Sequence, residues 1–129
     1  MGEVKFYVLM RSDLKSMNAG RAAAQATHAQ AALFTKHPKL FESQEYKIWM
    51  KKKLGFGKTI VLDAYDLTTL KGYIKDAKKE GRICGLVTDP TYTLQDGDFS
   101  INLPVVTCGY ILTEAYYGLN LFKGYKSYG

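Results

Sequence analysis

Three polar side chains recur at helical spacing inside an alanine-rich segment, MNAGRAAAQATHAQAAL, which spans residues 17–33. Arg21, Gln25 and His28 stand at positions i, i+4 and i+7, so they share one face of a helix. Arg21 falls in the first turn, where free backbone N–H groups and the helix dipole already attract an anion. A cation there is unfavourable for the helix itself, which favours a functional role. Solvation of Arg21 and a structural hydrogen bond for His28 are the alternatives.

A second group of polar side chains follows the apolar run RICGLV, in the segment VTDPTYT. Open α/β sheets bind ligands where strands end and helices begin. We therefore expect parallel strand order to bring Asp89 and Thr93 to the same sheet edge as Arg21. A carboxylate, a hydroxyl and a guanidinium there could orient a water and stabilise an oxyanion. Asp89 is equally compatible with a plain turn before Pro90.

Short apolar runs that alternate with helical patterns define the elements that must position these side chains. The predicted strands are residues 4–10, 59–65, 82–87 and 104–112, and the predicted helices are about residues 19–36, 39–53 and 67–80. Asn18 and Asp66 are candidate N-caps, and Gly81 is a candidate C-terminal stop. This order predicts one α/β domain over residues 1–129, with a mostly parallel sheet and helices on both faces. The polar segment 88–103 has no helical pattern and is predicted to be a loop.

The charge of the chain favours an anionic partner. The formal net charge is +6, which makes RNA the first candidate. Lysines near the end of the second helix could contact phosphates, although lysines there also complement the helix dipole. Several of the ten tyrosines cluster with lysines near the C-terminus. Their rings could stack on exposed bases or pack back on the sheet.

Several classes of protein are not expected. No apolar run approaches the roughly 18 residues of a membrane span, and the N-terminus lacks a signal-peptide pattern, so we expect a cytoplasmic protein. Cys84 and Cys108 lie in apolar runs and are expected to be buried thiols in a reducing compartment. His28 and His37 are not spaced with them as metal ligands, and GFGK (55–58) precedes a strand instead of following one. We expect neither a metal nor a cofactor.

A longer stretch, VLMRSDLKSMNAGRAAAQATHAQAAL (8–33), combines a strand, a turn and a helix in a specific pattern. It resembles the amino-terminal signature of the type 2 peptidyl-tRNA hydrolases. That signature is a strand ending in an Arg-x-Asp-Leu turn, then Gly-Lys, Ala-Ala-Gln and His-Ala on the first helix. The matching residues are Arg11, Asp13, Leu14, Gly20, Ala23, Ala24, Gln25, His28 and Ala29. The order of elements extends the resemblance over about residues 4–112.

The resemblance implies a three-layer α/β/α fold around a four-stranded mixed sheet. It also implies hydrolysis of the ester between a peptide and the 3′ end of tRNA, without a metal or cofactor. Family members are thought to use a lysine at the helix start and an aspartate with a nearby threonine after the third strand. Arg21, Asp89 and Thr93 occupy these positions here. Two departures stand out: arginine cannot deprotonate as lysine can, and DPTYTL replaces the family's Asp-Ala-Gly-Arg-Thr-Gln.

The patterns and the resemblance together give the expected site. In the catalytic group Asp89 orients a water, Arg21 stabilises negative charge, and Gln25 and Thr93 supply hydrogen bonds. The residues expected to bind substrate or tRNA are Arg11, Asn18, His28, Lys51, Lys52, Lys53 and Lys58. Peptidyl-tRNA is the expected partner, and a homodimer is possible. A non-catalytic RNA-binding protein and a protein-interaction module on the same fold are the alternatives.

Overall fold

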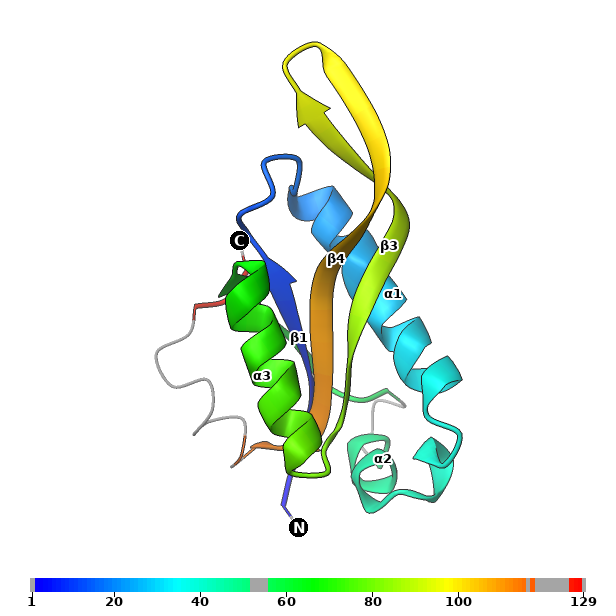
Figure 1. Ribbon diagram of the computed structural model, residues 1–129. Coiled ribbons are helices and arrows are strands. Elements are labelled where there is room, and N and C mark those ends of the chain that lie inside the picture. Colours follow the sequence, from blue (N-terminus) through cyan, green and yellow to red (C-terminus); the bar gives the residue numbers. More distant parts are fainter. Residues whose placement is uncertain (1, 52–55, 116, 118–125, 129) are drawn as a thin grey trace.

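The computed structural model describes residues 2–51, 56–115, 117 and 126–128. It contains one four-stranded sheet with helices, as Figure 1 shows. The elements are β1 (Val4–Arg11), α1 (Ala19–Lys36), the 3-10 turn η1 (Leu40–Glu42), α2 (Gln44–Trp49), β2 (Thr59–Tyr65), α3 (Leu67–Lys79), β3 (Ile83–Asp96) and β4 (Phe99–Glu114). The expected α/β class is therefore confirmed.

The sheet is mixed, with strand order β2-β1-β4-β3. Strand β1 runs parallel to β2 and antiparallel to β4, and β3 runs antiparallel to β4. Three strands thus share one direction, but β4 lies between two of them and makes two of the three neighbouring pairs antiparallel. The expectation of mostly parallel pairing is wrong. A two-residue turn joins β3 to β4, and such a short connection permits only an antiparallel pair.

Helices cover both faces of the sheet. On the central strand β1, Phe6 and Val8 belong to the core that includes α1 and α2, whereas Tyr7 and Leu9 belong to the core beneath α3. Figure 1 shows α3 on one side of the strands and α1 and α2 on the other. Burial on both faces explains why β1 reads as a continuous apolar run in the sequence.

Local capping fixes two of the helices at their expected ends. The Asn18 side chain accepts a hydrogen bond from the Arg21 N–H at 2.9 Å, and α1 begins at the next residue, Ala19. The Asp66 carboxylate accepts a hydrogen bond from the Thr69 N–H at 2.8 Å and starts α3. Gly81, with a φ of 73°, follows its last turn. These boundaries were predictable because each cap acts within three residues.

The predicted second helix, 39–53, is wrong in extent. Ser43 has an extended backbone, and it separates η1 from the short helix α2. Its hydroxyl donates to the Leu40 carbonyl and accepts a hydrogen bond from the Tyr46 N–H, so this one side chain ends one turn and caps the next. Lys51 follows α2, whereas Lys52 and Lys53 lie outside the described residues.

The segment 88–103 forms a hairpin, so its prediction as a loop is wrong. Strands β3 and β4 continue past the sheet and project at the top of Figure 1. Gly97, with a φ of 60°, is the first residue of the two-residue turn, a position that favours glycine in hairpins. The sequence YTLQDGDFSINL alternates around this turn, as paired strands do. The pairing slips between Val87 and Thr88 and again between Asp89 and Tyr92.

The end of the chain packs on the edge strand β2. Ser127 forms an antiparallel bridge with Leu62, and the Tyr128 N–H donates to the Val61 carbonyl at 3.0 Å. For residues 126–128 the packing interpretation of the tyrosine-rich tail is therefore confirmed. None of the helices in the described ranges is long and apolar enough to cross a membrane.

Candidate functional site

A fixed carboxylate lies where β3 passes the first half of α1. Asp89 Oδ2 accepts a hydrogen bond from Gln25 Nε2 at 2.7 Å. Asp89 Oδ1 accepts one from the Thr91 backbone N–H at 2.9 Å, with the Thr91 hydroxyl at 3.5 Å. One carboxylate oxygen of Asp89 therefore takes part in the turn with Thr91, and the other oxygen faces α1.

These contacts keep the carboxylate ionised. Partial burial acts to raise the pKa of Asp89, but hydrogen bonds from the Thr91 backbone and Gln25, together with the nearby His28, outweigh it. The net result is a pKa below the ordinary aspartate value. A half-buried, ionised carboxylate with a fixed orientation is suited to hold a water or a ligand N–H or O–H group.

A second hydrogen bond fixes the amide that faces Asp89. Gln25 is only 3% exposed, and its Oε1 accepts a hydrogen bond from the Thr107 hydroxyl at 2.7 Å. Because Thr107 supplies the donor, the Gln25 amide must present its N–H to Asp89. The line Thr107, Gln25, Asp89 therefore joins β4, α1 and β3.

Thr107 was missed from the sequence, and a bulge explains its position. Val87 pairs with Cys108 and Thr88 with Val106, which leaves Thr107 as an extra residue on β4. Thr107 and Cys108 can then both contact Gln25, although they are consecutive in the strand. The only hint in the sequence is a hydroxyl within the apolar run PVVTCGYIL.

Arg21 is held at the start of α1 by the preceding turn. Its Nη1 donates to the Ser16 carbonyl at 2.8 Å, and the Ser16 hydroxyl donates to the Thr93 carbonyl at 2.9 Å. These bonds tie the turn between β1 and α1 to the base of the hairpin. Among the described residues Arg21 forms no ion pair with Asp89, so the two side chains do not neutralise each other.

Thr93 lies on β3, four residues after Asp89. The Thr93 hydroxyl donates to Asn102 Oδ1 at 2.8 Å across the hairpin. The hydroxyl beside Asp89 belongs to Thr91, two residues earlier. Among the described residues no hydrogen bond joins Thr93 to Asp89, and the expected grouping of the two side chains stays a prediction.

Arg11 and Asn18 are already occupied by structural contacts. Arg11 binds both carboxylate oxygens of Asp13, at 2.9 and 2.8 Å, and donates to the Val106 carbonyl at 2.9 Å. Its side chain is 12% exposed. The hydrogen bond from Arg11 is the main cause that lowers the pKa of Asp13. Asn18 uses its Oδ1 to cap α1, so both residues shape the site more than they present groups to a ligand.

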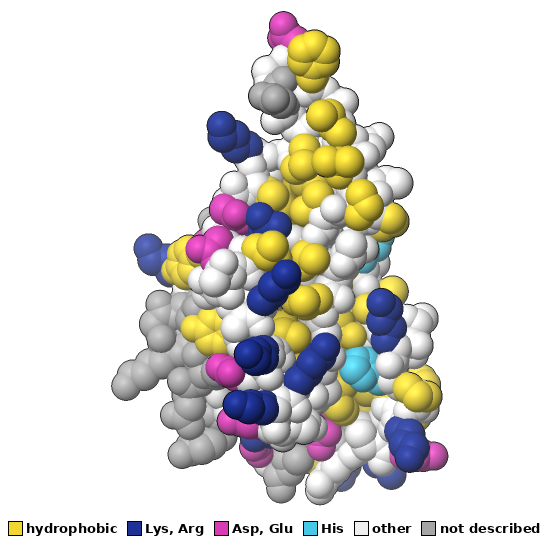
Figure 2. Space-filling model, in the orientation of Figure 1, with side chains coloured by type: hydrophobic (Ala, Val, Ile, Leu, Met, Phe, Trp, Pro, Cys, Tyr) yellow, Lys and Arg dark blue, Asp and Glu magenta, His cyan; other side chains and the backbone are white. Residues whose placement is uncertain are grey.

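The exposed His28 lies near enough to Asp89 to lower the pKa of that carboxyl. Lys51 and Lys58, which were expected to bind tRNA, lie elsewhere in the fold. Lys58 precedes β2, and its carbonyl accepts a hydrogen bond from Phe6 near the start of β1. It is therefore at the opposite end of the sheet from Asp89, and Lys51 follows α2. Figure 2 shows Lys and Arg side chains spread over one face instead of gathered in one cluster.

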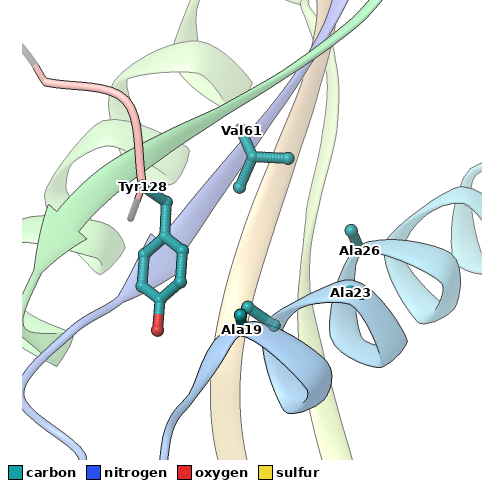
Figure 3. Close-up of a pocket in the computed structure, with 6 residues that line it drawn as sticks. Ala19, Ala23, Ala26, Val61 and Tyr128 are labelled. Atoms are coloured by element: carbon teal, nitrogen blue, oxygen red, sulfur yellow. The ribbon is translucent and has the colours of Figure 1, made fainter.

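Two hollows flank α1. The first, called here the α1–β3 groove, measures about 280 Å³ and includes His28, Ala32, Val87, Asp89 and Pro90 in its lining. The second measures about 350 Å³ and lies on the other side of the helix, where Tyr128 and Val61 stand across from alanines of α1 (Figure 3). Of these two hollows, the groove is the one whose lining includes Asp89 and His28.

The described residues offer no ready metal site. Across 2–51, 56–115, 117 and 126–128, no group of three or more His, Cys, Asp or Glu side chains could hold a metal ion. Cys84 and Cys108 are buried free thiols, as expected. Burial raises the pKa of Cys108 to about 12, so this thiol stays protonated and is a poor nucleophile.

Replacing Thr107 with valine tests the line from Thr107 to Asp89. The buried Gln25 Oε1 would lose its donor, so we expect the free energy of unfolding to fall by about 1–3 kcal/mol. The amide would also lose its fixed orientation, so we expect the pKa of Asp89 to rise towards its ordinary value. Urea unfolding and carboxyl NMR titration measure the two effects. Thr107→Ser keeps the hydroxyl and should restore the pKa; an unchanged Asp89 pKa in Thr107→Val would contradict the proposed coupling.

The sequence model of the family described as Peptidyl-tRNA hydrolase PTH2 matches residues 4–108. This range contains Arg21, Gln25, Asp89 and Thr107, and it ends inside β4. No curated protein matches the chain. Because the family match covers well over half of the 129 residues, the chain belongs to the PTH2 family of peptidyl-tRNA hydrolases.

Proposed function

We propose that this protein hydrolyses the ester that joins a peptide or an N-blocked amino acid to tRNA. The main support is the Asp89 carboxylate, fixed by Gln25 and Thr91 at the end of an open groove in a member of this family. A reaction on peptidyl-tRNA would take place in the cytoplasm, where translation occurs.

In the proposed reaction Asp89 orients the attacking water. The water oxygen bonds to the acyl carbon, the ester C–O bond breaks, and the ribose oxygen takes a proton. The products are a peptide carboxylate, a released proton and deacylated tRNA. The lowered pKa of Asp89 makes it a weak base, so its main contribution is to align and polarise the water. Gln25 acts as a positioning residue because its amide fixes Asp89, and Thr107 acts through Gln25.

Arg21 is assigned to the negative charge that develops on the acyl oxygen. One nitrogen of its guanidinium is anchored to the Ser16 carbonyl, which leaves further N–H groups for the substrate. Its place in the first turn of α1 adds the positive end of the helix dipole to the same region. The positive net charge and exposed lysines such as Lys51 and Lys58 would attract the tRNA backbone from outside the site.

One assay tests this function against non-catalytic RNA binding. Purified protein is mixed with N-acetyl-aminoacyl-tRNA, and release of the N-acetyl amino acid is measured for the wild type, Asp89→Asn and Arg21→Ala. Turnover that both substitutions reduce supports the proposal. Absence of turnover, with tRNA binding that weakens steeply as salt rises, would instead indicate an RNA-binding protein.

The second candidate is a protein-interaction module, and the apolar face of the hairpin favours it. Phe99, Ile101 and Leu103 are 75%, 48% and 44% exposed and lie on one face of β4. The opposite face is polar, with Gln95 bonded to Ser100. Figure 2 shows hydrophobic side chains along this projection. Apolar surface left open in this way is typical of a contact site, and a second copy of the chain could cover it.

If the hairpin joins two copies, the double substitution Phe99→Ser and Ile101→Ser should turn a dimer into a monomer. The apolar area lost from the contact is the reason. Light scattering measures the mass, and Gln95→Ser on the polar face serves as the matched control. A monomeric wild type, or a double variant that remains dimeric, would rule out this contact.

A further inference from the structure

The α1–β3 groove begins at the proposed catalytic carboxylate and runs away from it along the edge of the sheet. Asp89 and Pro90 lie at one end. One wall of the groove is β3 from Asp89 back to Leu86, and the other wall is α1 from His28 to Lys36. The walls between these points are small or apolar, including Ala32 and Val87. A substrate whose ester lies at Asp89 would therefore have one of its two halves in this groove.

The backbone of β3 forms an unpaired edge along the groove. In the part of the chain that the structure describes, β3 is the last strand of the sheet and β4 is its only neighbour. Within the described residues, no hydrogen bond from outside the β3–β4 ladder reaches the backbone of 86–88. Alternate N–H and C=O groups of such an edge point outward, where an extended peptide can bind as a further strand.

The charges around the groove indicate which half of the substrate it would bind. Asp89 is ionised and would repel a phosphate placed in the groove. Lys36 is the one lysine or arginine among the residues that line the groove, and it is exposed, as is His28. Arg21 and the start of α1 lie beyond the other side of Asp89 and suit the RNA half better. The groove is therefore matched to a peptide and not to a nucleic-acid backbone.

We propose that the α1–β3 groove binds the peptide half of the substrate as an extended strand on the free edge of β3. This inference rests on the proposed function. The esterified end of the peptide lies at Asp89, and its preceding residues run towards Leu86 and Lys36, so the peptide lies parallel to β3. From Leu86 to Asp89 the strand rises by roughly 10 Å, which is room for about three peptide residues.

Substrates of different peptide length test the groove. We expect kcat/KM to rise about tenfold from N-acetyl-alanyl-tRNA to N-acetyl-trialanyl-tRNA, because the added residues gain backbone and apolar contacts. A pentapeptide should give little further gain. N-methylation of one peptide nitrogen should remove much of the gain, whereas N-methylation of its neighbour should not, because alternate N–H groups face the strand.

A matched pair of tryptophan substitutions on α1 tests the location. Ala31 lines the groove, whereas Ala24, an exposed alanine on the same helix, does not line it. Ala31→Trp should abolish the length dependence and preserve hydrolysis of N-acetyl-alanyl-tRNA, while Ala24→Trp should behave like the wild type. Both side chains are exposed, so neither change disturbs the core.

The outcomes separate the inference from the function on which it rests. Hydrolysis of N-acetyl-alanyl-tRNA with no dependence on peptide length would overturn the peptide groove and leave the hydrolase intact. Length dependence that survives Ala31→Trp would overturn the location. No hydrolysis of any substrate would overturn the proposed function itself.

Discussion

Replacing Asp89 with asparagine is expected to lower kcat/KM for N-acetyl-aminoacyl-tRNA by about 10²–10³-fold. Asparagine preserves the size of the side chain, but it carries no negative charge to align and polarise a water. It also lacks one of the two acceptor oxygens that receive hydrogen bonds from Gln25 and Thr91. The measurement is the initial rate of N-acetyl amino acid release at substrate concentrations well below KM.

Asp76→Asn is the matched control for this substitution. Asp76 is an exposed carboxylate on α3, which covers the opposite face of the sheet from α1. The two variants lose the same charge and would weaken long-range attraction of tRNA to a similar extent. A rate that falls equally in both would show that Asp89 acts only through net charge, and an unchanged rate in Asp89→Asn would exclude it from the reaction.

The lowered pKa of Asp89 also sets the expected pH dependence. Its carboxyl is ionised at every pH above its folded-state pKa, which lies below the ordinary value of 3.8. Activity that depends on the carboxylate is therefore fully present near neutral pH and is lost only as the pH falls through that lowered pKa. Between about pH 5 and 8 Asp89 should contribute no slope to the profile of kcat/KM.

Elements defined by local interactions were predictable from the sequence. The start of α1 depends on Asn18 and that of α3 on Asp66, and each cap acts on a backbone N–H three residues away. The sequence of β1 is a continuous apolar run because both faces of this strand are buried. The hairpin was missed because its polar composition suggested a loop, although a Gly-Asp pair, here Gly97-Asp98, is a hairpin-turn signal.

Side chains brought together by strand register were not predictable. Thr107 reaches Gln25 because of a bulge opposite Val87 and Thr88, and no local pattern encodes that slip. Thr91 contacts the Asp89 carboxylate within a local turn, whereas the Thr93 hydroxyl bonds to Asn102 across the hairpin. Helical spacing groups Gln25 with Arg21 and His28, whereas in the structure Gln25 is buried together with Ala22, Ala29 and Leu33.

Arg21→Ala is expected to reduce kcat by about 10²–10³-fold, the usual effect of losing one donor to a developing oxyanion. The loss should fall mainly on kcat, because the negative charge on the acyl oxygen exists only in the transition state. Single-turnover hydrolysis of N-acetyl-aminoacyl-tRNA separates this step from binding. Lys78→Ala on α3 removes one positive charge from the opposite face and is the matched control.

Arg21→Lys distinguishes charge from shape at the position where the family carries lysine. Lysine keeps the positive charge but loses the planar group that bonds to the Ser16 carbonyl while presenting further donors. If charge is sufficient, Arg21→Lys should recover most of the activity lost in Arg21→Ala. If the anchored guanidinium is required, the kcat of Arg21→Lys should remain as low as that of Arg21→Ala. A rise in KM with unchanged kcat in Arg21→Ala would contradict both outcomes and assign Arg21 to a ground-state contact, such as a tRNA phosphate.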